Sequence, residues 1–163
     1  MAQIEFEDNT EQIIEEMRLK AIAWLEEAGG EIKSQAASNS RRASGDTAGS
    51  FRHEVDAGNM VCAIGSPEIN AVYEEFGTGE YALKGDGHKG WWVYVEGSDN
   101  DSGPSKTYTE QEARRAVAYL RSKGLPAHMT KGKRGTRALF NAFNSLKGPV
   151  QNKAKMNFKD LGD

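Results

Sequence analysis

The side chains best suited to catalysis or metal binding are scattered along this chain of 163 residues. Its three histidines, His53, His88 and His128, lie far apart, and no HxxxH or Cys/His spacing would gather them around one metal ion. The single cysteine, Cys62, lies in an apolar run, where we expect a small buried side chain rather than a reactive thiol. A chain with one cysteine cannot form an internal disulfide, and a protein without disulfides fits a reducing compartment.

Two adjacent carboxylates, Glu74 and Glu75, are the best candidates for acid–base chemistry. On an extended segment, neighbouring side chains point to opposite faces, so these two would not share a site. A hydrolase built on this pair is one alternative hypothesis, and it requires that Glu75→Gln abolish a measured activity without unfolding the protein. No Gly-x-Ser-x-Gly motif or Cys/His dyad supplies a nucleophile.

Two loops have the spacing of ligand-binding motifs but lack essential residues. Gly85 and Gly90 match the glycines of a phosphate-binding loop, yet two tryptophans follow where Lys and Ser or Thr are needed. The acids within 99–110 match three calcium-ligand positions, but Pro104 replaces the essential glycine. We therefore predict that the protein is not an enzyme and uses no catalytic residue, metal or cofactor.

Opposite charges gather at the two ends of the chain, whose net charge is -3. Residues 1–32 hold nine acids and two bases, whereas residues 111–163 hold three acids and twelve bases. Three explanations stay open: the ends attract each other within the fold, neighbouring subunits meet head to tail, or a basic surface faces nucleic acid. A small nucleic-acid-binding module that uses the basic C-terminal third is thus an alternative function. The densest basic cluster comprises Lys131, Lys133, Arg134 and Arg137.

The chain is polar for a compact monomer. Hydrophobic residues make up 37% of it, and its mean hydropathy is -0.69. We therefore expect neighbouring molecules to cover some of its apolar surface. No apolar stretch approaches the roughly 20 residues of a membrane span, and the first residues are acidic where a signal peptide is basic. We expect a soluble protein that is cytosolic when made and does not bind membranes.

The elements that would position these residues begin with a long helix. Apolar residues recur at three- and four-residue steps over 14–36, which predicts a helix from Thr10, its cap, to about Ala37. Gly29 and Gly30 interrupt this pattern, so the helix either bends there or lets another backbone approach. The aperiodic segment 38–49 predicts a loop.

Two antiparallel hairpins should follow. Ser50–Val55 and Met60–Gly65 have strand composition and are joined by a turn-forming stretch at 56–59. Trp91–Glu96 and Lys106–Tyr108 predict a second hairpin with a longer tip. The intervening segment, rich in glycine and aromatic residues, predicts a loop that is held in place by close backbone contacts.

The C-terminal third predicts helices separated by a basic loop. A capping box at Thr109–Glu112 starts a helix that ends near Gly124, and a basic loop follows at 125–135. A last helix begins at Thr136, and Gly148-Pro149 should stop or kink it. The whole pattern predicts an α+β fold, in which a long N-terminal helix and C-terminal helices pack on a small, mainly antiparallel β-sheet.

Three stretches of the chain resemble a known family. Tyr73–Gly79 reads Tyr-Glu-Glu-Phe-Gly-Thr-Gly, Gly85–Tyr94 contains Gly-Asp-Gly and Trp-Trp-Val-Tyr, and Ser44–Arg52 contains Asp-Thr-Ala-Gly. Together they resemble the head–tail joining, neck and tail-completion proteins of tailed phages, which are often described as minor tail components. The resemblance implies a single domain over 1–163. The residues themselves predict an inserted helix at 109–124 and, over 150–163, either a further helix or a flexible tail.

The resemblance also implies a function. Members of this family are structural virion proteins, so we expect a homo-oligomeric ring, hexameric in the virion, that joins the tail to the head connector. Its partners would be the head connector, tail-terminator or tail-tube proteins, and DNA that passes without sequence-specific binding. Residues expected to serve fold and assembly are Tyr73, Glu75, Phe76, Gly77, Thr78, Gly79, Trp91 and Trp92. Residues expected to face a partner or the DNA channel are Lys131, Lys133, Arg134 and Arg137.

The chain departs from the family pattern at three places. Ala48 lies where glycine is usual, Thr109–Lys123 adds a helix where related chains pass quickly from a strand to a loop, and Pro126–Met129 is a loose version of a Pro-x-Pro-Phe turn. All but the first lie in the C-terminal third.

Overall fold

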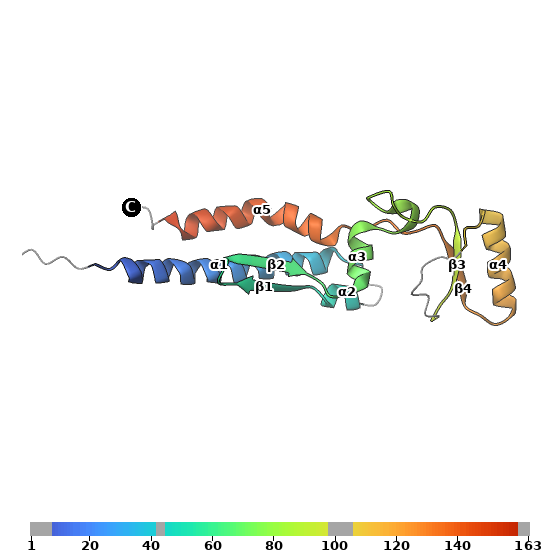
Figure 1. The fold of residues 1–163 in the computed structure, drawn as a ribbon, viewed down its shortest axis with the longest axis horizontal. Coiled ribbons are helices and arrows are strands. Elements are labelled where there is room, and N and C mark those ends of the chain that lie inside the picture. Colours follow the sequence, from blue (N-terminus) through green and yellow to red (C-terminus); the bar gives the residue numbers. More distant parts are fainter. Residues whose placement is uncertain (1–7, 42–44, 98–105, 160–163) are drawn as a thin grey trace, which may run out of the picture. The chain divides into compact units, whose positions relative to one another are not determined.

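The computed structural model describes residues 8–41, 45–97 and 106–159. It divides into two units, Met1–Glu68 with Ala138–Asp163, and Ile69–Arg137, and each is described by itself. Long helices at both ends of the chain and two small antiparallel sheets confirm the predicted α+β class (Figure 1). The sheet is not one layer, however, because each unit contains its own two-stranded sheet.

The first unit is built on two helices that lie side by side, α1 (Thr10–Asn39) and α5 (Ala138–Asn157) (Figure 1). The Asn39 Nδ2 atom donates to the Ala138 carbonyl at 3.1 Å, which joins the end of α1 to the start of α5. Farther along, Lys153 of α5 pairs with Glu27 at 3.0 Å and with Glu31. The two helices are therefore antiparallel, and attraction between the acidic and basic ends operates within one chain.

A hairpin packs on α1, as the sequence predicted. Strand β1 (Arg52–Asp56) pairs with β2 (Val61–Gly65) in antiparallel register. The Asp56 carboxylate accepts the backbone N–H groups of Gly58 and Asn59, which closes the turn. The hairpin follows a four-residue helix, α2 (Asp46–Gly49), in the segment where a loop was expected.

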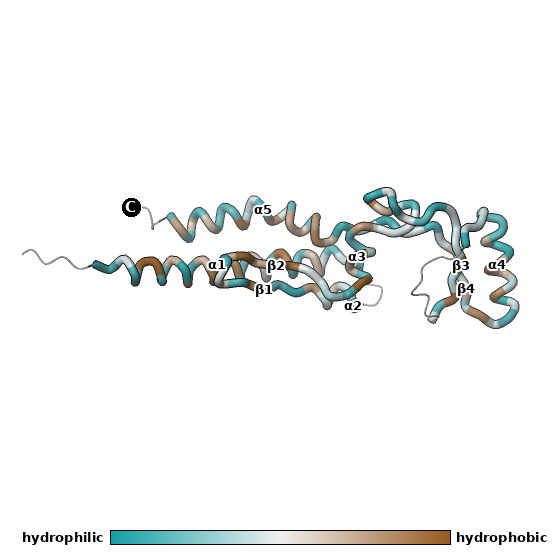
Figure 2. The backbone as a smooth tube through the Cα atoms, viewed as in Figure 1, coloured by the Kyte–Doolittle hydropathy of each residue, from teal (hydrophilic) through white to brown (hydrophobic). Residues whose placement is uncertain are grey.

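The core of this unit is small. Its buried cluster contains one aromatic residue, Phe51, and several alanines from the facing helices. Alanines let the α1 and α5 backbones approach closely, and hydrophobic residues recur along both helices in Figure 2. The cluster comprises Ile32, Ala36, Phe51, Ala138 and Ala142.

The two adjacent glycines of α1 have different surroundings. A Cβ atom on Gly29 would lie 2.5 Å from Cys62 Sγ and 2.8 Å from His53 Cδ2, whereas one on Gly30 would lie 3.9 Å from His53 Cε1. The close approach expected here is thus made by side chains of the hairpin rather than by another backbone. The helix assignment continues through both glycines.

We expect these two glycines to respond oppositely to alanine. Gly30→Ala should stabilise the protein by about 1 kcal/mol, since alanine favours the helix and meets only ordinary contacts. Gly29→Ala gains the same propensity but forces apart the packed hairpin, so we expect a net loss of about 1 kcal/mol. Urea unfolding followed by circular dichroism measures both. Equal effects of the two changes would contradict the tight packing at Gly29.

The second unit contains α3 (Ile69–Phe76), a short 3₁₀ turn η1 (Gly79–Tyr81), strand β3 (Trp92–Val95), α4 (Glu110–Ser122) and strand β4 (Ala127–Thr130). The predicted capping box is confirmed, since the Thr109 hydroxyl accepts from Glu112 N and the Glu112 carboxylate accepts from Thr109 N. Helix α4 packs against β3 and β4. Helix α4 therefore covers the sheet of this unit.

Several sequence-based predictions for this half of the chain are wrong. The first is the pairing of Trp91–Glu96 with Lys106–Tyr108, which make only one bridge, Trp91 with Tyr108. The partner of β3 is β4, within the segment predicted as a basic loop. The second is the extended backbone expected around Glu74, which lies in α3.

The helix ends also differ from prediction. Asn9 rather than Thr10 occupies the N-cap position of α1, and α5 begins at Ala138 rather than Thr136. Pro149 lies inside α5, which continues to Asn157 instead of stopping there. A proline this far into a helix removes one backbone hydrogen bond, and burial of the next residue, Val150, against the rest of the unit offsets that loss.

None of the helices in the described part of the chain is both long and apolar enough to cross a membrane.

Candidate functional site

The two groups of residues singled out in the sequence meet in the second unit. The segments 77–80 and 131–133 run antiparallel and exchange backbone hydrogen bonds, and we call this paired structure the clasp. Thr78 N–H donates to Lys133 O at 2.9 Å, Lys133 N–H donates to Thr78 O at 3.3 Å, and Glu80 N–H donates to Lys131 O at 2.9 Å. The Thr78 hydroxyl also accepts from Lys133 N–H at 3.1 Å. The Gly-Thr-Gly signature and the basic cluster are thus one piece of structure.

Glycines permit this close pairing. Gly79 has a φ of 59°, and a Cβ atom there would lie against the Lys131 carbonyl and 2.7 Å from Trp92 Cη2. Gly132, with a φ of 117°, would place its Cβ against the Thr78 carbonyl. A Cβ atom on Gly77 would lie 2.6 Å from the Tyr81 carbonyl oxygen, and one on Gly135 would lie 2.6 Å from the Glu75 carbonyl oxygen. Any side chain at these positions would force the two segments apart.

A buried carboxylate lies beside the clasp. Glu74 is 8% exposed, and its Oε1 atom is ion-paired with Lys133 Nζ. The Glu74 carbonyl oxygen accepts from the N–H groups of Thr136 at 2.6 Å and Arg137 at 3.2 Å. Glu74 therefore ties α3 to the chain that follows the clasp. Sequence reasoning named Glu75, not Glu74, among the assembly residues.

A second ion pair and several aromatic rings surround the clasp. Lys131 Nζ lies 3.3 Å from Glu80 Oε2, and it also lies 5.9 Å from the centre of the Tyr81 ring and 5.8 Å from that of Trp91. The Arg134 guanidinium lies 5.3 Å from the Tyr81 ring centre. Contacts of this length between cations and rings are attractive. The basic cluster is therefore engaged within its own unit.

The glycine-rich loop after η1 is held to the same structure. Glu80 Oε1 accepts from Gly90 N–H at 3.2 Å, and the His88 ring meets the Trp92 ring edge to face at 5.4 Å. Because Trp92 also contacts Gly79, it connects strand β3 to the clasp. The expectation of a loop held in place by close contacts is confirmed for this segment.

We expect the stability of the clasp to depend on pH through the Glu80–Lys131 pair. Hydrogen bonds from Lys131 and Gly90 lower the pKa of Glu80 below its ordinary value, and Glu80 raises the pKa of Lys131. A carboxylate with a lowered pKa stabilises the fold above its ordinary pKa of about 4.5, and this contribution is lost as the pH falls through the lowered value. The lysine contribution is lost only at high pH, above its ordinary value.

We therefore expect the stability difference between wild type and Glu80→Gln to shrink as the pH falls below about 4.5. Hydrogen exchange of the Thr78 and Glu80 amides would report opening of the clasp directly. The same comparison for Lys131→Gln should show the same loss at low pH. A difference that stays constant from neutral to acidic pH would contradict a stabilising role for this pair.

The outward face of α3 is apolar. Tyr73 and Phe76, two of the predicted assembly residues, lie on it together with Ile69 and Val72, and all four are exposed. Five of the predicted residues build the clasp, namely Gly77, Thr78, Gly79, Lys131 and Lys133. Three others surround it, namely Trp91, Trp92 and Arg134. Glu75 is half-buried, and Arg137 adopts a positive φ of 55° just before α5.

The described residues contain no group of three or more His, Cys, Asp or Glu side chains that could hold a metal ion. Of the calcium-loop pattern considered above, Asp99 and Asp101 lie outside the described residues, and Glu110 pairs with Arg114 at 2.6 Å.

Comparison of the chain with family models, with curated proteins and with solved structures found no match.

Proposed function

We propose that this protein is a structural component of a tailed-phage virion, located at the head–tail junction. Copies of the chain form a ring, hexameric in the virion, that joins the tail to the head connector and surrounds the DNA channel. It contacts the head connector on one side and tail-terminator or tail-tube proteins on the other. The chain acts without catalysis, and it assembles in the host cytoplasm before it becomes part of the particle.

One observation carries this proposal: the signature segment forms a hydrogen-bonded backbone clasp next to an exposed apolar helix face. Four closely packed glycines and two ion pairs lie in or beside the clasp, and one of these pairs joins it to Glu74 of α3. The apolar stripe of α3 then faces away from its own unit. An exposed apolar surface of this kind suits a protein that joins a larger assembly.

The nucleic-acid-binding alternative is disfavoured by the partners of the basic residues. Lys131 and Lys133 are paired with Glu80 and Glu74, so much of their charge is neutralised locally. Binding of duplex DNA depends on release of counterions by uncompensated positive charge, and its affinity falls steeply with salt. Tight DNA binding at moderate salt that Lys131→Gln weakens would favour the alternative instead.

The proposal is tested on particles from a phage or prophage that carries this gene. We expect mass spectrometry of purified virions to detect the protein, and electron microscopy to locate it between head and tail. Without the gene, filled heads and separate tails should accumulate, and purified protein should restore joining. Complete infectious particles that lack the protein would overturn the proposal.

A further inference from the structure

Helix α3 is amphipathic with its apolar side outward. Its large apolar residues follow i, i+3, i+4, i+7 spacing and so share one face, while Ala71 and the carboxylate of Glu74 occupy the buried face. The exposed fractions of the four residues are 60% for Ile69, 45% for Val72, 48% for Tyr73 and 47% for Phe76. We call them the α3 stripe.

This inversion is costly for an isolated molecule. Full burial of one such side chain stabilises a protein by about 1.5–3 kcal/mol, and each of the four side chains of the α3 stripe lacks much of this stabilisation. Isolated apolar residues on a surface are ordinary, but a continuous stripe on a helix that is held by a buried ion pair indicates a docking surface.

A second exposed apolar surface lies on the other unit. Phe140 and Phe143 of α5 are 46% and 49% exposed, and Lys147 continues the same face one turn later. We call these three residues the α5 stripe. The buried residues of α5, such as Ala142, lie on a different face against α1.

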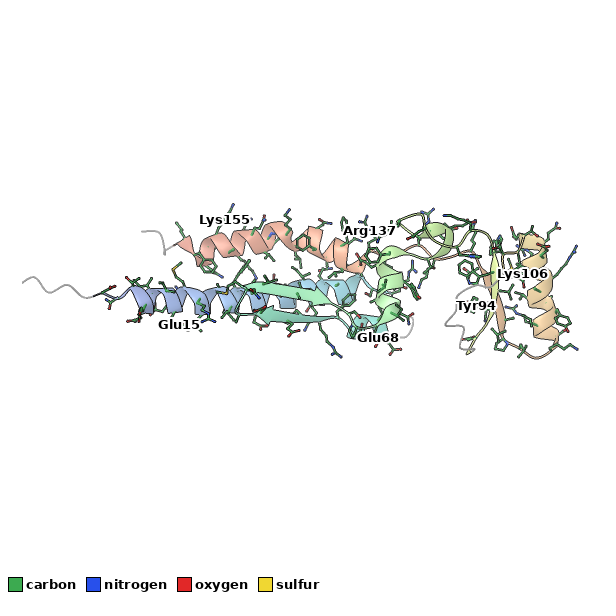
Figure 3. The ribbon with its side chains drawn as sticks, viewed as in Figure 1. Glu15, Glu68, Tyr94, Lys106, Arg137 and Lys155 are labelled. Carbon is green, nitrogen blue, oxygen red and sulfur yellow. The ribbon has the colours of Figure 1, made fainter. Side chains whose placement is uncertain are left out.

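The charges around the two stripes are complementary. Helix α3 contains no base; Glu74 is paired with Lys133, so the acids near the stripe are Glu75 and Glu68, which directly precedes the helix. Helix α5 contains no acid; its Lys153 is paired with glutamates of α1, and its other two bases are Lys147 and Lys155. Glu68 and Lys155 mark these opposite signs in Figure 3. The exposed Ile14 of α1 lies among glutamates, whose charge would repel the glutamates beside the α3 stripe.

We propose that the α3 stripe of one copy docks on the α5 stripe of a second copy. This inference rests on the proposed function, because it names the contact through which neighbouring copies meet. The two surfaces differ, so the contact is heterologous and can continue from copy to copy until a ring closes. Four side chains of this size bury roughly half the area of a standard interface, so a single contact is weak and several together are stable.

The test uses two full-length variants that each lose one surface. Val72→Glu with Tyr73→Glu removes the α3 stripe, and Phe143→Glu removes the α5 stripe. All three substitutions are at exposed positions, and circular dichroism checks that both variants fold. Sedimentation velocity at increasing concentration then measures association of wild type, of each variant alone, and of their equimolar mixture. Tyr119→Glu, on an exposed tyrosine of α4, is the matched control.

We expect wild type and the Tyr119→Glu control to associate equally and each stripe variant to associate at least about tenfold more weakly. In the mixture, each variant still presents one intact surface, so one-to-one pairs should form with nearly the wild-type affinity for one contact. Association should stop at these pairs, because the two surfaces that a pair still exposes are the substituted ones. A symmetric contact between two α3 stripes predicts instead that the Phe143→Glu variant self-associates, which would overturn the proposal.

A cysteine pair captures the contact where association is too weak to sediment. Chains with Cys62→Ser and Val72→Cys are mixed with chains with Cys62→Ser and Phe143→Cys and then oxidised. Cross-linked heterodimers are expected in excess over either homodimer, and their absence would overturn the proposal. The proposal is equally overturned if Ile14→Glu, rather than the α3 variant, abolishes association.

The two proposals fail separately. If the protein is found in virions but both stripe variants still join heads to tails, the docking contact is wrong while the proposed function stands. If the mixed variants pair as expected but virions lack the protein, the contact stands and the proposed function is wrong.

Discussion

Replacing Gly79 by alanine should destabilise the second unit by about 3–5 kcal/mol. Two costs add: a left-handed backbone is unfavourable for alanine, and the new Cβ would press on the Lys131 carbonyl and on Trp92. Neither neighbour can yield easily, because the first belongs to the paired backbone and the second to strand β3. Hydrogen exchange at the Thr78, Glu80 and Lys133 amides, together with urea unfolding, measures the loss.

Gly85 is the matched control for this change. It has a similar φ of 72°, but a Cβ atom there would meet nothing within 4 Å. Gly85→Ala should therefore cost only the backbone term, about 1 kcal/mol, and leave exchange in the clasp unchanged. If both substitutions cost the same, the close approach of the two segments contributes nothing, and the clasp is not the rigid structure described above.

Local patterns predicted three features well, two in the first unit and one in the second. The three- and four-residue apolar period of α1, the turn chemistry at 56–59 and the capping box of α4 are all encoded by residues close together in the chain. Such signals do not depend on distant partners. The error at Pro149 has the opposite origin, since packing against α1 outweighs the local preference of proline to end a helix.

The clasp lay beyond such patterns because its two segments are 55 residues apart. The pairing of Thr78 with Lys133 leaves no local mark, and Ala127–Thr130 has too little β-branched or aromatic content to predict a strand. The glycines at 77 and 79 did indicate a close backbone approach, but they could not indicate to what. The two groups of candidate residues were named separately from the sequence, and their contact with each other was not predicted.

Glu74 was named from the sequence only as one of two adjacent carboxylates on extended backbone, and its burial and ion pair were not predicted. In an extended chain Glu74 and Glu75 are equivalent choices on opposite faces, whereas in a helix their positions relative to the apolar stripe differ. The structure buries Glu74 with Lys133 and leaves Glu75 at the edge of the stripe. Assignment of this helix would have separated the two glutamates, but an apolar stripe ordinarily packs inward, so the sequence would still have placed Glu74 in solvent and left its pairing with Lys133 unpredicted.

Two phenylalanines of the first unit should separate folding from assembly. Phe51 is 8% exposed and is the only aromatic residue of the core cluster formed by the described residues. Phe51→Ala should therefore lower the free energy of unfolding by about 3–5 kcal/mol. With a core made largely of alanines, nothing nearby can fill the space, so thermal unfolding by circular dichroism should show a large downward shift of Tm.

Phe143→Ala removes the same side chain from an exposed position on α5. We expect it to change the free energy of unfolding by no more than about 0.5 kcal/mol, because half of that ring is already in water. Its self-association should nevertheless weaken, whereas the folded fraction of Phe51→Ala should associate like wild type. A Phe143→Ala variant that unfolds as readily as Phe51→Ala would place Phe143 in the core and remove the α5 stripe. The large aromatic residues outside the small core would then belong to the packing of the monomer itself, and no second copy would be needed to cover them.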